Sequence, residues 1–385
     1  MTEAFGRFAA RPEWTPWARR LVAVRHPILL ALAFLSTYIQ RGDADWTLLS
    51  AGGQRLFSAA PWTVYAHTSG LQAGPLTLVV VRGMNILPGG WGLWATHVLL
   101  AILGWYLLFL AERWTSPDVG LRRAPLKTGL LTLAVGIPVM VEWGWVAGDS
   151  PHLEDPLAIL LFLLAVRAIT KGNETRAAVL IGLALAFKPW AIAALPLVLG
   201  CQRKIKAIAI AIAVPAACWL PFVLGDHATL SAAGHGFRWL DNAPLHLLGL
   251  ASGPLPDWWR SAELLGVLAA AALAARQDWR IAFAAGCTMR LLLDPAAFPY
   301  YYAGLLMATA LTERLIGARP WRTAVLFVGV GVLPAVSDSK AAYLLQAVTL
   351  AVVYVSWLQP LRGRATANPF RRRLTFTGRD AGAPA

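Results

Sequence analysis

The chain has 385 residues, of which 57% are hydrophobic and only 14% charged, with a mean hydropathy of +0.56. Soluble domains carry roughly 25% charged residues, so the composition excludes a soluble domain with a single anchor and favours a polytopic membrane protein. The net charge of +14 does not indicate nucleic acid as a partner, because the bases flank apolar segments, as they do in membrane proteins. The three cysteines match no metal or redox spacing.

Basic residues gather at both ends of the apolar region and divide the chain into three parts. We expect a basic cytoplasmic N-terminus (1–25), a single membrane domain (26–358) and a basic cytoplasmic tail (359–385) in a protein of the cell membrane, with membrane lipids as partners. No small-residue cleavage site follows 27–40, so this segment is expected to be a retained span and not a removed signal peptide.

Apolar runs of near-spanning length predict ten transmembrane helices, since a span needs about 20 residues. They cover 26–40, 91–111, 126–147, 156–170, 205–224, 261–276, 280–294, 300–316, 322–336 and 340–358. The shorter run 75–88 is expected to be an interfacial or re-entrant helix, and 175–201 a hairpin that returns to its own side. Counting both arms of the hairpin and 75–88 as crossings extends the number to thirteen. The predicted fold class is therefore an all-α polytopic membrane protein with about 10 to 13 transmembrane helices.

This topology places most of the remaining acids and histidines on the outer face. The larger outer segments are 41–90, 148–155, 225–260 and 294–300. Polar chemistry is therefore expected on that side. The positive-inside rule is the alternative explanation, because it removes bases from outer segments and so leaves mainly acids there.

The first outer segment holds the candidate catalytic acids, Asp43 and Asp45, which lie close to a membrane boundary where an idle charge is unfavourable. From Trp46 onward the sequence predicts an amphipathic helix in the interface. One acid could cap this helix while the other is catalytic. Tyr65 and His67 follow in an aromatic loop that could pack on a sugar or on lipid.

Two cations are candidates for binding phosphate. Lys188 interrupts the 175–201 segment before a proline, and a lysine at membrane depth is a functional candidate unless it snorkels to the headgroups. Arg290 precedes Asp294 by four residues, which indicates either a structural pair or a guanidinium that reaches a phosphate. Tyr301 begins the next span, in an aromatic belt or lining the same cavity.

The third outer segment contributes His235 and Arg238, which would share a helical face with Asp241. The histidine spacing does not fit a metal pair, and neither a zinc site nor a nucleotide-binding motif is present in the sequence. We therefore expect no metal and no cofactor.

Several short motifs occur in a particular order. They are Asp45-Trp46, Ala51-Gly52, Leu56-Phe57, Val64-Tyr65, Gly74-Pro75-Leu76, Asp155-Pro156-Leu157-Ala158 and GLALAFKPWAIAALPLVLG at 182–200. In order and spacing the chain, from about residue 20 to 358, resembles the GT-C superfamily of integral-membrane glycosyltransferases. Within it, the chain is most similar to the polyprenyl-phosphate-mannose-dependent mannosyltransferases of glycosyltransferase family 87.

The resemblance implies an inverting transfer of a sugar from a polyprenyl-phosphate donor to a glycolipid or glycan acceptor at the outer face. Asp45 matches the general base of the family, with Asp43 as alternate, and Lys188 and Asp155 match its later motifs. Mannose is the implied sugar and arabinofuranose the alternative. The chain departs from the family at Arg82 and in having no evident soluble C-terminal domain. A transporter or flippase of an amphipathic lipid is the alternative function, since transporters also use broken segments.

Overall fold

The computed structural model describes residues 15–43, 45–68, 70–116, 125–229, 237–296, 298–333, 337 and 339–360. These residues are organised as helices, with one isolated antiparallel bridge between Arg238 and Pro254. This bridge replaces the helical face that we expected to carry Arg238 and Asp241. The expected site residue His235, most of the basic N-terminus and nearly all of the tail lie outside the described residues.

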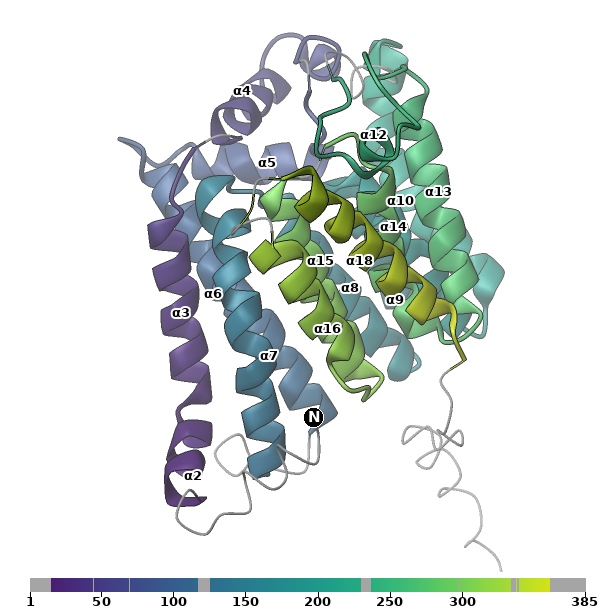
Figure 1. Ribbon diagram of the computed structural model, residues 1–385. Helices are drawn as coiled ribbons and strands as arrows, with labels where there is room; N and C mark the ends of the chain where they lie inside the picture. The colour runs from purple at the N-terminus through teal and green to yellow at the C-terminus, as the bar shows by residue number, and fades with distance from the viewer. Residues whose placement is uncertain are drawn as a thin grey trace, which may run out of the picture.

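The first part of the chain forms two helices that meet at a bend, followed by three short helices. Helices α2 (Thr15–Ala23) and α3 (Arg25–Ile39) meet at a bend of 57°. The segment expected on the outer side then forms α4 (Trp46–Leu56), the short 3₁₀-helix η2 (Pro61–Thr63) and α5 (Pro75–Met84). Figure 1 shows α4 and α5 together at one end of the molecule, beyond the end of α3.

The rest of the chain forms the body of the helical bundle. Its elements are α6 (Trp91–Thr115), α7 (Leu126–Gly144) with its π-helical extension η4 (Trp145–Asp149), α8 (Glu154–Thr170), α9 (Glu174–Phe187), the 3₁₀-helix η5 (Pro189–Gly200), α10 (Lys204–Gly225), α12 (Pro244–Leu247), α13 (Trp259–Ala275), η6 (Trp279–Ile281), α14 (Ala282–Leu293), α15 (Pro299–Leu315), α16 (Trp321–Leu326) with its π-helical extension η7 (Phe327–Val332), and α18 (Lys340–Leu358).

Four helices of the described residues are long and apolar enough to cross a membrane. They are α6, α7 with η4, α10 and α18, and the bent pair α2–α3 would make a fifth. This number is smaller than the ten to thirteen expected from hydropathy. The difference arises because other apolar runs form shorter helices: α8, α13 and α15 have 17 residues each and α14 has 12. The architecture of the described residues is thus all-helical, with four to five candidate membrane spans.

The helices differ strongly in how deeply they are buried. In α15, every residue from Tyr300 to Glu313 is buried, and this helix packs against α6, α7 and α14. By contrast, only 17% of the apolar window of α10 is buried inside the protein. An apolar helix that is open on most sides is expected to face lipid, so α15 is central and α10 is peripheral.

The 175–201 segment is broken where the sequence indicated. Helix α9 ends at Phe187, Lys188 is extended with φ −147° and ψ 122°, and η5 follows. The Glu174 carboxylate at the start of α9 accepts hydrogen bonds from the backbone N–H groups of Gln202 and Arg203, just beyond η5. The start of the first arm and the end of the second therefore lie side by side, so the segment has the shape of a hairpin. Helix α5 has ten residues, too few to span a bilayer, in line with an interfacial or re-entrant helix.

Candidate functional site

The site is anchored by Asp45, which occupies the N-cap position of α4. Its side chain makes no hydrogen bond to the helix N–H groups, so it does not act as a cap. The Gly42 N–H donates to the Gly148 carbonyl at 2.9 Å and holds the loop against the end of η4. The Asp45 carboxylate is directed to His152, with 2.7 Å between Oδ2 and Nε2.

His152 connects Asp45 to the start of α8. Its Nδ1 lies 2.7 Å from Glu154 Oε1, and its ring stacks on Tyr300 at a centroid distance of 4.1 Å. The residue is 6% exposed. The carboxylates on both ring nitrogens and the aromatic ring on one face leave the imidazole little freedom to reorient.

Lys188 reaches the same carboxylate from the hairpin break. Its Nζ lies 2.6 Å from Glu154 Oε1 and 3.7 Å from Asp155 Oδ1. Asp155 also accepts a 3.0 Å hydrogen bond from the Trp190 indole. Both acids lie in the first turn of α8, where the helix dipole favours negative charge. We call the connected groups Asp45, His152, Glu154, Lys188 and Asp155 the polar chain.

A second buried group of charges lies beside the polar chain, and we call it the arginine cluster. It consists of Arg260 and Glu263 of α13, Arg290 of α14, and Asp294, which follows α14. Arg260 NH1 lies 2.7 Å from Glu263 Oε2 and 3.5 Å from Asp294 Oδ1. Arg290 NH2 lies 3.4 Å from Asp294 Oδ2, which confirms the predicted i, i+4 pair.

Aromatic rings bridge the two groups. The Arg290 guanidinium lies 4.0 Å from the centroid of Tyr301 and 5.2 Å from that of Trp190, whose indole is bonded to Asp155. Such ring faces stabilise a desolvated cation. Arg290 thus connects the arginine cluster to the polar chain.

A cavity of about 80 Å³ opens between the hairpin break and the arginine cluster. Its charged lining is Lys188, Arg260, Glu263 and Arg290, and Tyr65 lines it from the segment between η2 and α5. Within the described residues, Arg260 Nε and NH2 are buried and have no hydrogen-bond partner. A buried guanidinium with open donors is costly unless a ligand uses them, so the cavity is suited to an anion.

The charged groups of the polar chain shift the pKa values of Asp45 and His152. Burial disfavours the charged form of Asp45, but the hydrogen bond from His152 and the positive charges of His152 and Lys188 outweigh it and lower its pKa from 3.8. Burial also disfavours imidazolium, yet the Glu154 carboxylate and the bond to Asp45 raise the pKa of His152 from 6.5 to about 9. At neutral pH, His152 is therefore a cation that donates to both carboxylates.

The structure unites most of the expected site residues. Asp45, Lys188 and Asp155 belong to the polar chain, while Tyr65, Arg290 and Tyr301 surround the cavity or contact its lining. The others lie apart from the site: the side chains of Asp43, His67 and Arg238 are exposed, and the Arg55 side chain donates to the His67 carbonyl.

Four members of the site were not among the residues expected from the sequence: His152, Glu154, Arg260 and Glu263. For these four residues the sequence contained a local signal, since they form two short-range pairs of one acid and one base. His152 and Glu154 are two residues apart at the head of an apolar run, and Arg260 precedes Glu263 by three residues in a helix. No local signal links His152 to Asp45, which are 107 positions apart.

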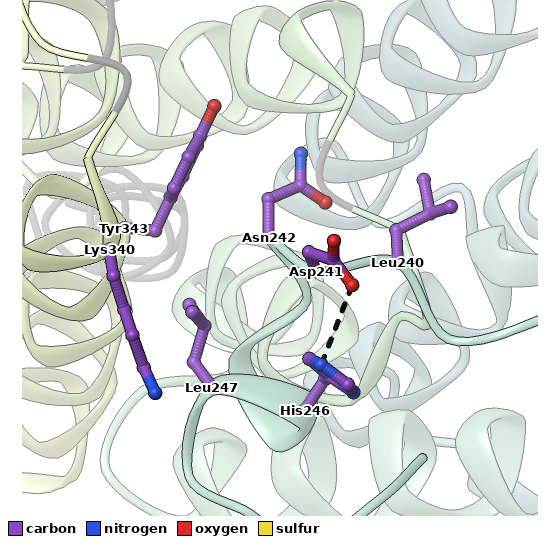
Figure 2. Close-up of a pocket in the computed structure, with 7 residues that line it drawn as sticks. All are labelled: Leu240, Asp241, Asn242, His246, Leu247, Lys340 and Tyr343. Atoms are coloured by element: carbon purple, nitrogen blue, oxygen red, sulfur yellow. Dashed lines mark ion pairs between the residues drawn. The ribbon is translucent and has the colours of Figure 1, made fainter. Parts of the chain in front are cut away.

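A wider hollow lies near the α12 segment. Its volume is about 600 Å³, and it is lined by Leu240, Asp241, Asn242, His246, Leu247, Lys340 and Tyr343. Figure 2 shows Lys340 and Tyr343 on one side and the Asp241–His246 ion pair on the other. The Leu240 N–H donates to the Pro295 carbonyl, one residue from Asp294, so this hollow adjoins the arginine cluster.

Comparison of the chain with protein-family models, with curated proteins and with solved structures gives no match. Within the described residues, no group of three or more His, Cys, Asp or Glu side chains is arranged to hold a metal ion. Fold and site together define an all-helical protein with four to five candidate membrane spans and a buried, charged site at the hairpin break.

Proposed function

We propose that the protein is an inverting glycosyltransferase of the GT-C type that transfers a sugar, mannose in the first instance, from a polyprenyl phosphate to an acceptor hydroxyl. The observation that carries this proposal is the connection of Asp45 through His152 and Glu154 to Lys188, which lines a cavity with open arginine donors. A base and an anion site thus belong to one connected group.

Asp45 serves as the general base in this mechanism. One carboxylate oxygen is bonded to His152, while the side chain as a whole remains 30% exposed and accessible to an acceptor. The acceptor oxygen attacks the anomeric carbon, its proton passes to Asp45, and the bond between that carbon and the phosphate oxygen breaks. A base for this step has to lie within about 3 Å of the hydroxyl. His152 orients Asp45 and, as a cation at neutral pH, does not compete for the proton.

The cavity stabilises the leaving group. Polyprenyl phosphate departs with an additional negative charge, and preformed cations at that position lower the barrier. Arg260 offers free Nε and NH2 donors, and Lys188 and Arg290 line the same cavity. Its 80 Å³ is far below the roughly 300 Å³ of an ordinary ligand pocket, so it is suited to the phosphate, with the sugar toward Asp45.

The proposal includes the topology of the family. The 12- to 17-residue helices would cross a thinned or shielded part of the bilayer alongside the longer spans, giving about 10 to 13 crossings. The polar chain, α4 and α5 would then face the outer side of the cell membrane, where a glycolipid or glycan acceptor arrives. Both ends of the chain would be cytoplasmic.

A transporter or flippase is the second candidate, because the extended Lys188 between α9 and η5 is a broken segment of the kind that forms transport sites. Proteoliposomes containing the full chain, polyprenyl-phosphate [³H]mannose and a glycolipid fraction separate the two functions. A transferase releases polyprenyl phosphate and places the label in a glycosidic linkage. Intact donor that only changes leaflet would establish transport and refute our proposal.

A further inference from the structure

A third hollow lies at the opposite end of α10 from the first outer segment. The C-terminal end of α10 contacts η2, where Phe222 meets the Trp62 ring at 5.9 Å. The hollow lies at the N-terminal end, about 33 Å away for a helix of 22 residues, between the α8–α9 turn and the start of α10. It is therefore remote from the polar chain, and its volume is about 580 Å³.

The rim of this hollow is positively charged. Lys171 of the α8–α9 turn, Arg203 and Lys206 all line it, and all three are exposed. The one acid in its lining, Glu174, already accepts hydrogen bonds from two backbone N–H groups of the η5–α10 turn. The remaining lining groups include the neutral polar side chains of Asn173 and Thr175. The rim thus complements an anion.

The floor of the hollow is apolar and belongs to a helix that is open on most sides. Ala207 and Ile210 of α10 form part of the lining, and only 17% of the apolar window of α10 is buried inside the protein. A soluble anion would make no use of this apolar floor, whereas an acyl chain would be attracted to it.

We propose that this hollow binds an anionic glycerophospholipid. The phosphate headgroup lies among Lys171, Arg203 and Lys206, and an acyl chain lies against Ala207 and Ile210 of α10. Basic pockets between membrane helices bind such headgroups, and each base contributes about 1 kcal/mol of attraction at an anionic surface. The site does not depend on the proposed transferase activity.

The test measures lipid binding to the purified full-length chain by native mass spectrometry. Phosphatidylglycerol is titrated against the wild type and against the triple variant Lys171→Gln/Arg203→Gln/Lys206→Gln. A loss of about fivefold per base predicts that the triple variant binds on the order of a hundredfold more weakly. The matched control, Arg113→Gln/Arg276→Gln/Arg319→Gln, removes the same charge at exposed positions outside the hollow and is expected to bind normally.

Binding measurements with two other ligands identify the class of ligand. Phosphatidylcholine should bind weakly, and inorganic phosphate should compete poorly because it cannot use the apolar floor formed by Ala207 and Ile210. If the triple variant does not fold, Lys206→Gln alone should lose about fivefold while Lys206→Arg retains binding. Equal losses in the triple variant and its control, or equal affinity for inorganic phosphate and phosphatidylglycerol, would overturn the proposal.

Discussion

Asp45 stands where a helix cap is expected, yet its carboxylate bonds to His152 and not to the N–H groups of α4. The sequence left cap and catalyst as alternatives, and the geometry excludes the cap. Sequence spacing did predict the Arg290–Asp294 pair, because four residues of helix fix that contact. It could not predict the Asp45–His152 bond, which depends on how the loop before α4 meets the end of η4 in the folded chain.

His152 should make stability depend on pH. Its pKa is raised from 6.5 to about 9 on folding, so its stabilisation is complete below pH 6.5 and is lost as the pH rises toward 9. A shift of this size corresponds to about 3 kcal/mol. Unfolding of the detergent-solubilised protein between pH 6 and pH 9.5 should therefore show a decline that is absent in His152→Gln. If the stability of the variant declined with pH to the same extent, a titratable group other than His152 would be responsible for the decline.

Arg260 should determine the affinity for the donor. Its free Nε and NH2 donors are expected to bind phosphate, and a hydrogen bond to a charged group contributes about 1.5–3 kcal/mol. Arg260→Gln should lower kcat/KM for the lipid-phosphate donor about 10- to 100-fold. Arg276→Gln, beyond the other end of α13, serves as the control and should leave it unchanged. If both substitutions lowered kcat/KM equally, Arg260 would not belong to the phosphate-binding site.

At the scale of elements, the site depends on how α5 meets the end of α9. The Gly74 N–H donates to the Phe187 carbonyl at 2.7 Å, and the Thr77 hydroxyl donates to the same oxygen at 2.8 Å. This carbonyl directly precedes Lys188. The hairpin break was evident from Lys188-Pro189 in the sequence, but its attachment to α5 was not, since these elements are more than 100 residues apart.

Gly74→Ala should disturb this junction. A Cβ at Gly74 would collide with the Ala186 carbonyl oxygen, which is backbone and cannot rotate away. We expect a loss of about 1–3 kcal/mol in unfolding free energy and reduced turnover through displacement of Lys188. Gly83→Ala is the matched control on the same helix, because a Cβ there meets no atom within 4 Å. Its helix propensity should make it neutral or stabilising by up to about 1 kcal/mol. Equal melting temperatures for the two variants would contradict the proposed junction.

For the whole molecule, hydropathy predicted the helical architecture and its candidate spans but not the lengths of the other helices. The candidate spans α6 and α10 were evident as long apolar runs, whereas α13 and α14 end after 17 and 12 residues. Tertiary contacts set these ends: Asp294 after α14 is fully buried beside Arg260 and Arg290, so the chain leaves the helix at a charged site inside the protein.

Labelling the two ends of α13 tests whether the short helices cross the membrane. Asp257 and Arg276 are exposed at its opposite ends, and the proposed topology places them on opposite sides of the membrane. In a background in which Cys201, Cys218 and Cys287 are replaced by alanine, Asp257→Cys should react with an impermeant maleimide on intact cells. Arg276→Cys should react only after permeabilisation. Labelling of both from outside would show that α13 does not cross and would favour the smaller number of spans.

The central claim is that Asp45 removes the acceptor proton. Turnover of polyprenyl-phosphate mannose by purified Asp45→Asn, compared with Asp43→Asn and the wild type, tests it most directly. Loss of a positioned base should lower kcat about 10²- to 10⁴-fold in Asp45→Asn. Asp43 is exposed and two residues away, so Asp43→Asn should retain nearly full turnover. Full turnover in Asp45→Asn, with folding intact, would contradict the assignment.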